Sequence, residues 1–350
     1  MRALYFGTYD REHPRNVNAI AAMTEAGVQV SERQVPIRRG GLLGTLEIFA
    51  AETRLSTPVP GAARRRDFDV VIVGYPGHFD VPRARRVARK RPLVFDAVLS
   101  LEDELVEVRR RFRPRSTAAT VLRVVDSRAL RLPDLVVCGT HAEASYLEQL
   151  GARRTAVIFL GADEDVFCET WSPAYPFSAL YVADASHDVV EAAALLAPEV
   201  PVRIVEPGEI PAGDRGIAFA HAGIVLGSFR ESRAIPPAVF EALATGAPVI
   251  TGNTPAAREL LDDGTSALLV APGDAAALAE ALSRLAADDA LRAAIAAQGR
   301  RVYAERASRR VLGARWREAL AADAPHEYVA LRNLPGALRG RIGRGGRRRR

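Results

Sequence analysis

The sequence has few cysteines and no long apolar run, and each shortage excludes a class of protein. Its two cysteines, Cys138 and Cys168, are too few for a disulfide framework. Cys138 ends an apolar run, a position typical of a buried free thiol. We find no stretch of about eighteen residues that is both apolar and uncharged, so no membrane-spanning helix is expected. The short apolar run at residues 3–6 leads directly into charged residues, which is unlike a signal peptide. We therefore predict a cytoplasmic protein.

Metal and cofactor motifs are also missing. The six histidines show neither paired helical spacing nor neighbouring cysteine pairs, which argues against a structural metal site. A Gly-x-Ser-x-Gly elbow of a serine hydrolase is not present. The loop after residues 3–6 lacks the triple-glycine fingerprint of a dinucleotide site. We expect neither a metal ion nor a bound cofactor.

Positive charge is concentrated at the end of the chain. The formal net charge is +6, and residues 331–350 hold eight arginines and no acidic residue, so the rest of the chain is close to neutral. No aromatic residue is interleaved with these arginines, and we therefore do not expect nucleic-acid binding. Two interpretations of the tail stay open. It is a solvated, disordered extension, or it binds anionic lipid at the inner face of a membrane, where each basic residue contributes about 1 kcal/mol.

Short apolar runs rich in β-branched residues alternate with helical patterns along the chain. Continuously apolar strands are typical of a parallel sheet that is buried on both faces. Their alternation with helices predicts an α/β fold of two doubly wound, Rossmann-like domains that face a cleft. The expected strands are residues 3–6, 28–35, 70–73, 93–95, 135–137 and 156–159, then 179–182, 202–205, 224–226, 248–251 and 267–270.

Breaks in this pattern divide the chain into five parts. Residues 168–177 contain two prolines and no periodicity, which indicates a linker. We therefore predict an N-terminal domain at 1–167, a linker at 168–177 and a second domain at 178–305. A helical segment at 306–330 and the basic tail at 331–350 are expected to follow.

The most informative stretch surrounds Glu241. Pro236 and Pro237 stand where a helix begins, and proline is tolerated there because the first N–H groups of a helix lack partners. The exposed N–H groups and the helix dipole suit an anion such as a diphosphate. Glu241 lies about one turn further on, where a carboxylate can accept two hydrogen bonds from a ribose. Because ligands of doubly wound sheets bind at the carboxyl ends of strands, we predict a nucleotide site in this loop.

This stretch resembles the C-terminal domain of the group 1 (family 4-type) glycosyltransferases, which have the GT-B fold. Residues 236–251 read PPAVFEALATGAPVIT and are similar to the signature of the spore-maturation-type branch. Residues 257–282, ARELLDDGTSALLVAPGDAAALAEAL, continue the likeness. Residues 160–167, LGADEDVF, resemble an element that joins the two domains in that family.

The resemblance implies a metal-independent enzyme of the hexosyltransferase type. It would move a sugar from a nucleoside diphosphate sugar to an acceptor hydroxyl, with retention of configuration. The acceptor is a sugar, a lipid-linked molecule or a small molecule. The nucleotide-sugar domain is then 178–305, and 1–167 is the acceptor side. Two alternatives stay open: a nucleotide-sugar epimerase or hydrolase of the same fold, and a nucleotide-binding protein without catalysis.

The resemblance also names site residues. Donor binding is expected from Glu241, Phe240, Ser228, Arg230 and Arg233, and from Gly7 and Thr8 in the first strand-to-helix loop. Arg233 stands eight residues before Glu241, where the family often has a second glutamate.

The family's basic pair after the first strand of the second domain is missing here, so we expect Arg230 or Arg233 to replace it. Arg11 and Arg15 are candidates for binding an anionic acceptor or a phosphate. His78 and Asp96 are the catalytic candidates, although a core histidine is an equally open interpretation of His78.

Overall fold

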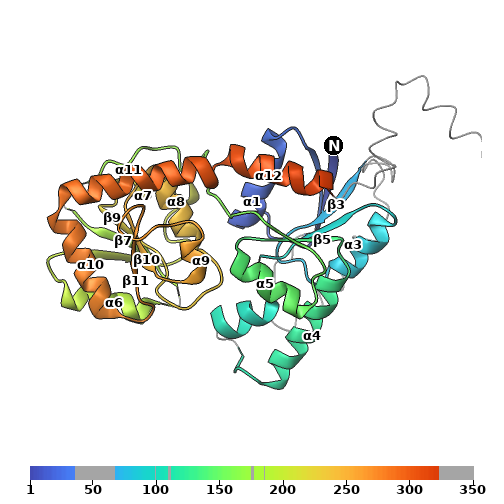
Figure 1. The fold of residues 1–350 in the computed structure, drawn as a ribbon, viewed down its shortest axis with the longest axis horizontal. Helices are drawn as coiled ribbons and strands as arrows, with labels where there is room; N and C mark the ends of the chain where they lie inside the picture. The colour runs from blue at the N-terminus through green and yellow to red at the C-terminus, as the bar shows by residue number, and fades with distance from the viewer. Residues whose placement is uncertain (36–67, 99, 109–111, 175–176, 185, 323–350) are drawn as a thin grey trace, which may run out of the picture.

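The computed structural model describes residues 1–35, 68–98, 100–108, 112–174, 177–184 and 186–322. They form two α/β domains side by side (Figure 1). The basic tail expected at 331–350 lies outside the described residues.

The N-terminal domain is built on a parallel sheet of six strands in the order β2-β1-β3-β4-β5-β6. The strands are β1 (Arg2–Gly7), β2 (Gln29–Gln34), β3 (Val70–Val73), β4 (Leu93–Asp96), β5 (Leu135–Cys138) and β6 (Thr155–Val157). The helices are α1 (Pro14–Glu25), α3 (Val81–Ala88), α4 (Thr117–Arg131) and α5 (His141–Leu150), with a π-helix η1 (Asp103–Val108). Strands β3, β4 and β5 are buried along their whole length, as their continuous apolar runs predict.

The C-terminal domain repeats this plan with five parallel strands in the order β11-β10-β9-β7-β8. They are β7 (Ala179–Val182), β8 (Val202–Val205), β9 (Ile224–Leu226), β10 (Val249–Gly252) and β11 (Leu268–Val270). The helices are α6 (His187–Leu196), α7 (Arg215–His221), α8 (Pro237–Thr245), α9 (Pro255–Arg258), α10 (Ala275–Ala287) and α11 (Asp289–Arg306), with a 3-10 turn η2 (Ala212–Asp214). The predicted class, two doubly wound α/β domains, is confirmed.

The last described helix, α12 (Arg309–Ala322), leaves the C-terminal domain and packs on α1 of the N-terminal domain (Figure 1). Gly313 allows this close approach, since a Cβ there would lie 2.4 Å from the carbonyl oxygen of Ala22. Trp316 is almost fully buried in the same contact. The predicted linker, 168–177, contains no helix or strand in its described residues. The chain therefore crosses between the domains twice.

Within the described residues, no helix combines the length and apolar character that crossing a membrane requires.

Candidate functional site

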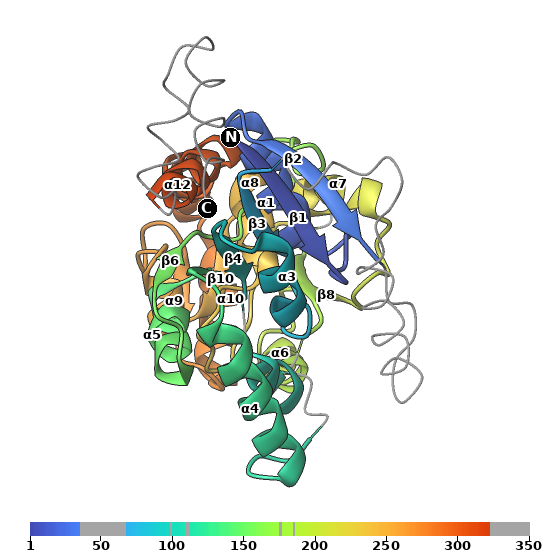
Figure 2. The same ribbon diagram turned by 90° about the vertical axis from the view of Figure 1, so that its right-hand side faces the viewer.

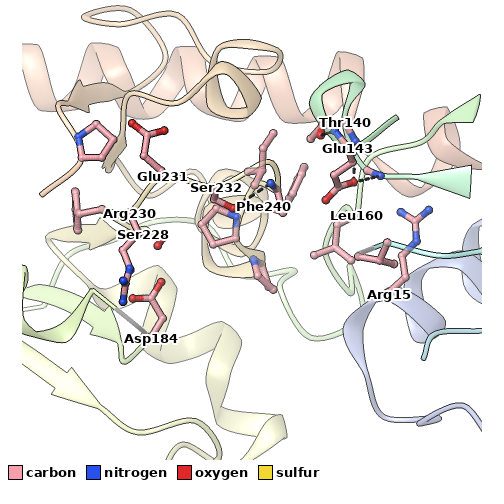
Figure 3. A pocket seen from close by; sticks show the side chains of 18 of the residues that line it. Arg15, Thr140, Glu143, Leu160, Asp184, Ser228, Arg230, Glu231, Ser232 and Phe240 are labelled. Carbon is pink, nitrogen blue, oxygen red and sulfur yellow. Dashed lines mark hydrogen bonds between the residues drawn. The ribbon is translucent and has the colours of Figure 1, made fainter. Parts of the chain in front are cut away.

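A cavity of about 670 Å³ lies between the two domains. Loops that follow strands of both sheets line it, together with the first turns of α1, α5, α6 and α8. These are the carboxyl ends of parallel strands, where doubly wound domains bind their ligands. Figure 3 shows Arg15, Thr140, Glu143 and Leu160 at one end, and Asp184, Ser228, Arg230 and Glu231 at the other.

Hydrogen bonds hold the loop after β9 in place. The Oγ atoms of Ser186 and Ser228 lie 3.0 Å apart, and the N–H of Phe229 donates to Ser186 Oγ at 2.9 Å. The N–H of Gly252 donates to the carbonyl of Ser228 at 2.8 Å. These bonds fix the backbone of the loop from which Ser228, Arg230 and Glu231 line the cavity.

Helix α8 begins where the two prolines predict it. Pro236 is the N-cap and Pro237 the first helical residue, and both line the cavity. Phe240, the predicted donor-binding residue of the first turn, also lines it. Its ring lies 6.2 Å from the ring of Phe159 in the N-terminal domain. The start of α8 therefore faces the cavity, and the contact of Phe240 with Phe159 joins the two domains beside it.

The carboxylate of Glu241 is engaged by an arginine of the neighbouring helix α7. This carboxylate is buried, and both oxygens accept hydrogen bonds from Nη2 of Arg215 in α7, at 3.0 and 2.7 Å. Burial raises the pKa of Glu241 above its ordinary value, and Arg215 opposes that rise. Glu241 is not among the described lining residues, so its contact with a ribose stays a prediction.

The two arginines of the loop after β9 diverge. Arg230 lines the cavity next to Asp184 (Figure 3). Arg233 instead faces the N-terminal domain, where its Nη1 lies 2.9 Å from Asp103 Oδ2 and its guanidinium lies over the ring of Tyr146. The carboxylate of Asp103 attracts Arg233 to the domain interface. Of the two arginines expected to replace the missing basic pair, Arg230 is the one that lines the cavity.

Arg15 and Asp96 form a buried ion pair beneath the cavity. Nε of Arg15 donates to both oxygens of Asp96, at 2.8 and 2.9 Å, and Nη1 donates to the carbonyl of Ile158 at 2.7 Å. The Arg15 guanidinium also lies 5.9 Å from the ring of Trp316. Burial raises the pKa of Asp96, and Arg15 opposes that rise. Arg15 reaches the lining, whereas Asp96 is fully buried below it.

The first strand-to-helix loop is held by Asp80. Both the N–H and the Oγ1 of Thr8 donate to Asp80 Oδ2, at 2.8 and 2.9 Å. Gly7 has a φ of 136°, and a Cβ there would lie 2.7 Å from the same oxygen. The glycine therefore admits the side chain of Asp80, and neither Gly7 nor Thr8 is among the lining residues that the structure describes.

Arg11 and His78 also lie outside the lining of the described cavity. Arg11 is exposed and binds Glu32 of the edge strand β2 at 2.9 Å. His78 is buried with its ring 4.9 Å from that of Phe95, and its Nε2 lies 3.5 Å from Asp126 Oδ1. Burial raises the pKa of Asp126 to about 6. This is the setting of a core histidine, and the catalytic role stays a prediction.

Glu143 lines the cavity and is absent from the residues expected from the sequence. It is the third residue of α5 in a capping box, in which Thr140 Oγ1 accepts from its N–H and Glu143 Oε2 accepts from the N–H of Gly139 and Thr140. Burial raises the pKa of Glu143 to about 8, against the lowering effect of these bonds. The motif T-x-x-E at 140–143 is a signal that could have identified the cap, although not that it faces a cavity.

Carboxylates outnumber basic groups around the cavity. The acidic lining residues are Glu143, Asp184, Asp188 and Glu231, and the arginines are Arg15 and Arg230. Arg15 is bound to Asp96, and Arg230 lies at the other end of the cavity, beside Asp184. Glu231, Asp184 and Asp188 are absent from the residues expected from the sequence, because only the arginines of these loops suit a phosphate.

A second set of contacts closes the domain interface beside the cavity. The carboxylate of Glu259, next to α9, accepts hydrogen bonds from the N–H of His141 and of Ala142, at 2.7 and 2.9 Å. Thr140 Oγ1 donates to the carbonyl of Arg233 at 2.5 Å. The start of α5 is therefore capped by the opposite domain.

Residues 183–321 match a protein-family model described as glycosyl transferase-like. No curated protein matches the chain at a significant level. Among solved structures, HepE of Anabaena in complex with UDP and glucose is similar over 92% of this chain and 99% of its own, with a TM-score of 0.63 and 18% identity. Sucrose-phosphate synthase of Thermosynechococcus elongatus is similar over 92% and 99%, with a TM-score of 0.66 and 16% identity.

A glycosyltransferase of Rickettsia africae is similar over 93% and 99% of the two chains, with a TM-score of 0.60 and 12% identity. At such identities the structural likeness shows the fold. The predicted resemblance to group 1 glycosyltransferases of the GT-B fold is confirmed by the family match and the fold together. The spore-maturation branch stays a prediction.

Proposed function

Because residues 183–321 match a glycosyl transferase-like family and the chain has the GT-B fold, we propose that it moves a sugar from a nucleoside diphosphate sugar to an acceptor hydroxyl in the interdomain cavity. The observation that carries the proposal is that the carboxyl ends of both sheets and the start of α8 face one cavity of about 670 Å³. A cavity of this size suits a ligand as large as a nucleotide sugar.

The C-terminal wall binds the donor. The diphosphate lies at the loop after β9, where backbone N–H groups and the guanidinium of Arg230 stabilise its charge. Glu231 accepts hydrogen bonds from hydroxyls of the transferred sugar, since it lines the cavity while Arg233 is turned to the interface. Glu241 binds the ribose after exchanging its contact with Arg215. HepE was solved with UDP and with UDP-glucose, so a uridine diphosphate sugar is the first donor to test.

The N-terminal wall binds the acceptor. His13, Tyr75 and Glu143 offer polar groups there, and the pKa of Glu143, raised to about 8, keeps that group protonated near neutral pH. A hydroxyl of a sugar, of a lipid-linked molecule or of a small molecule fits this chemistry. The reaction proceeds with retention of configuration, which NMR assignment of the product anomer tests. It proceeds without a metal ion, which turnover in the presence of a chelator tests.

The alternatives differ in what they release. An epimerase or hydrolase of this fold converts the donor without an acceptor, and the family match does not favour it. A nucleotide-binding protein without catalysis binds UDP and converts nothing. Incubating the protein with UDP-glucose, with and without a mixture of sugar and lipid-linked acceptors, separates the three by the products formed.

Binding is tested by calorimetry with UDP and UDP-glucose on the protein and two variants. Glu231→Gln is expected to weaken binding of UDP-glucose about ten- to hundredfold, since one charge-assisted hydrogen bond is worth about 1.5–3 kcal/mol, while UDP binds as before. Glu305→Gln, on the exposed face of α11, is the matched control. Failure of UDP and of every other nucleoside diphosphate to bind would refute the proposed function.

A further inference from the structure

Exposed apolar side chains gather on α4 and the turn before it. Phe112, Val121 and Val124 are 36%, 56% and 47% exposed. Val121 and Val124 are three residues apart and therefore share one face of the helix. The opposite face of α4 is buried against the domain through Ala119, Ala129 and Leu130. The apolar side chains are therefore on the outer face of a helix that is already anchored.

Arginines surround this apolar face at both ends. Arg113 and Arg115 follow Phe112 in the turn, and Arg128 and Arg131 continue the outer face beyond Val124. These four arginines are exposed and form no ion pair with any residue that the structure describes. Residues 112–131 hold five arginines and a single acidic residue, Asp126, which is fully buried.

We infer that this surface, formed by residues 112–131, docks on an anionic lipid bilayer. Exposed apolar groups flanked by basic residues are the chemistry that binds a peripheral protein to such an interface. Aliphatic and aromatic side chains enter the boundary between headgroups and acyl chains, and the arginines pair with lipid phosphates. Figure 2 shows α4 at the far end of the molecule from α12, where a flat surface can reach it.

A second exposed apolar pair, on α6, differs from the α4 surface in the charge of its neighbours. Leu195 and Leu196 at the end of α6 are 83% and 61% exposed, more than Val121 or Val124 on α4. Glu191 and Glu199 stand near them in the sequence, and no arginine lies between residues 187 and 200. An anionic surface repels the carboxylates beside this pair and finds no arginine there to bind, which makes the pair the matched control for α4.

The direct test places a tryptophan at each surface of the full-length chain. Phe112→Trp and Leu196→Trp are mixed with vesicles of brominated phosphatidylcholine and phosphatidylglycerol, and the quenching in excess of the parent protein is measured. We expect quenching at position 112 and none at 196. Vesicle binding without quenching at position 112 would overturn the inference, and would assign the binding to the arginine-rich segment 331–350.

Sedimentation with vesicles measures the contributions of the arginines and of the apolar side chains separately. Arg113→Gln combined with Arg115→Asn is expected to weaken binding about thirtyfold, because each basic residue contributes about 1 kcal/mol and about 1.4 kcal/mol is tenfold. Asparagine suits position 115, where φ is 61°. Val121→Glu with Val124→Glu is expected to weaken it more than tenfold, and Leu195→Glu with Leu196→Glu to leave it unchanged.

Each of these substitutions lies on an exposed side chain, so circular dichroism and melting temperature should match the parent protein. Equal losses for the α4 and α6 variants would overturn the inference, as would undiminished binding by both α4 variants. If the fluorescence of the Phe112→Trp variant shifts with an oligonucleotide or an acidic peptide and not with vesicles, the surface serves a different partner and a lipid one is refuted.

Discussion

Both carboxylate oxygens of Glu241 in α8 accept hydrogen bonds from one nitrogen of Arg215 in α7, at 3.0 and 2.7 Å. The carboxylate is buried, so Arg215 is what keeps an ionised group stable there. A ribose that hydrogen-bonds to Glu241 must therefore displace Arg215 from the carboxylate. The Glu241–Arg215 pair thus links donor binding to the stability of the C-terminal domain.

Arg215→Met should cost about 3–5 kcal/mol of folding free energy near pH 8, because it leaves a buried carboxylate unpaired. The pKa of Glu241 then rises further above its unfolded value. The variant loses folding stability as pH rises from the unfolded to the folded pKa of Glu241, and regains it as pH falls. The free-energy cost of Arg215→Met should therefore be smaller at pH 5 than at pH 8. Urea unfolding at both pH values measures this.

Adding Glu241→Gln to Arg215→Met should recover most of that loss at pH 8, since no charge remains to be buried. Equal stability of the single and double variants would show that the ion pair contributes little. It would then be packing of Arg215 over Phe167 that matters.

Glu143 should give the folded protein a pH-dependent stability of its own. Its pKa is raised by burial to about 8, so between its unfolded value of about 4.3 and pH 8 the folded state holds a proton that the unfolded state releases. Stability from this group is complete at low pH and falls as pH rises, by at most about 1.4 kcal/mol per pH unit.

Glu143→Gln should flatten this dependence, because glutamine stays neutral and still accepts from the N–H of Gly139. Unfolding at pH 5, 6, 7 and 8, taken as the difference from the parent protein, isolates the effect. Glu148→Gln, on the exposed side of the same helix, is the control. A pH dependence that Glu143→Gln leaves unaltered would place the titrating group elsewhere.

Glu259 should control how tightly the two domains close. Its carboxylate caps α5 from the opposite domain through the N–H groups of His141 and Ala142. Glu259→Gln weakens two charge-assisted hydrogen bonds, each worth about 1.5–3 kcal/mol. We expect faster amide exchange at 141 and 142 and a larger radius of gyration by small-angle scattering. Unchanged exchange at both amides would show that the domains stay closed without this cap.

The sequence predicts the sheets well because each buried strand carries its own signal. Val70–Val73 is apolar at every position and is buried at every position. The edge strand β2, QVSERQ, is half exposed and mostly polar. Its own residues therefore give a weaker strand signal than those of the buried strands. Helix α8 is predictable from a local signal too, because two prolines and a following glycine bound it.

The site is harder to predict, because its side chains take partners that are distant in sequence. Arg15 is bound to Asp96, and Arg233 to Asp103 of the other domain. Neither pairing leaves a local trace, so both arginines look available to a phosphate when the sequence is read alone. Glu143 is the opposite case: its capping box is local and readable, and only the meeting of the two domains makes it part of a cavity.

The loop after β9 offers the sharpest test of the donor site, because it contains two arginines with opposite orientations. Arg230 lines the cavity, whereas Arg233 binds Asp103 and stacks on Tyr146. If the diphosphate lies at this loop, Arg230→Ala should weaken binding of UDP about ten- to hundredfold, since a hydrogen bond to a charged group is worth about 1.5–3 kcal/mol. Binding of uridine, which has no phosphate, should change little.

Arg233→Ala is the matched control, three residues away in the same loop. It removes the contact with Asp103, so it should affect UDP and uridine equally through the closing of the domains. Calorimetry with both ligands on both variants completes the comparison. A selective loss of UDP in Arg233→Ala, with Arg230→Ala unaffected, would mean that the loop rearranges on binding and that Arg233 contacts the phosphates. Equal losses of UDP and uridine in Arg230→Ala would place the diphosphate away from this arginine, because only a phosphate contact discriminates between the two ligands.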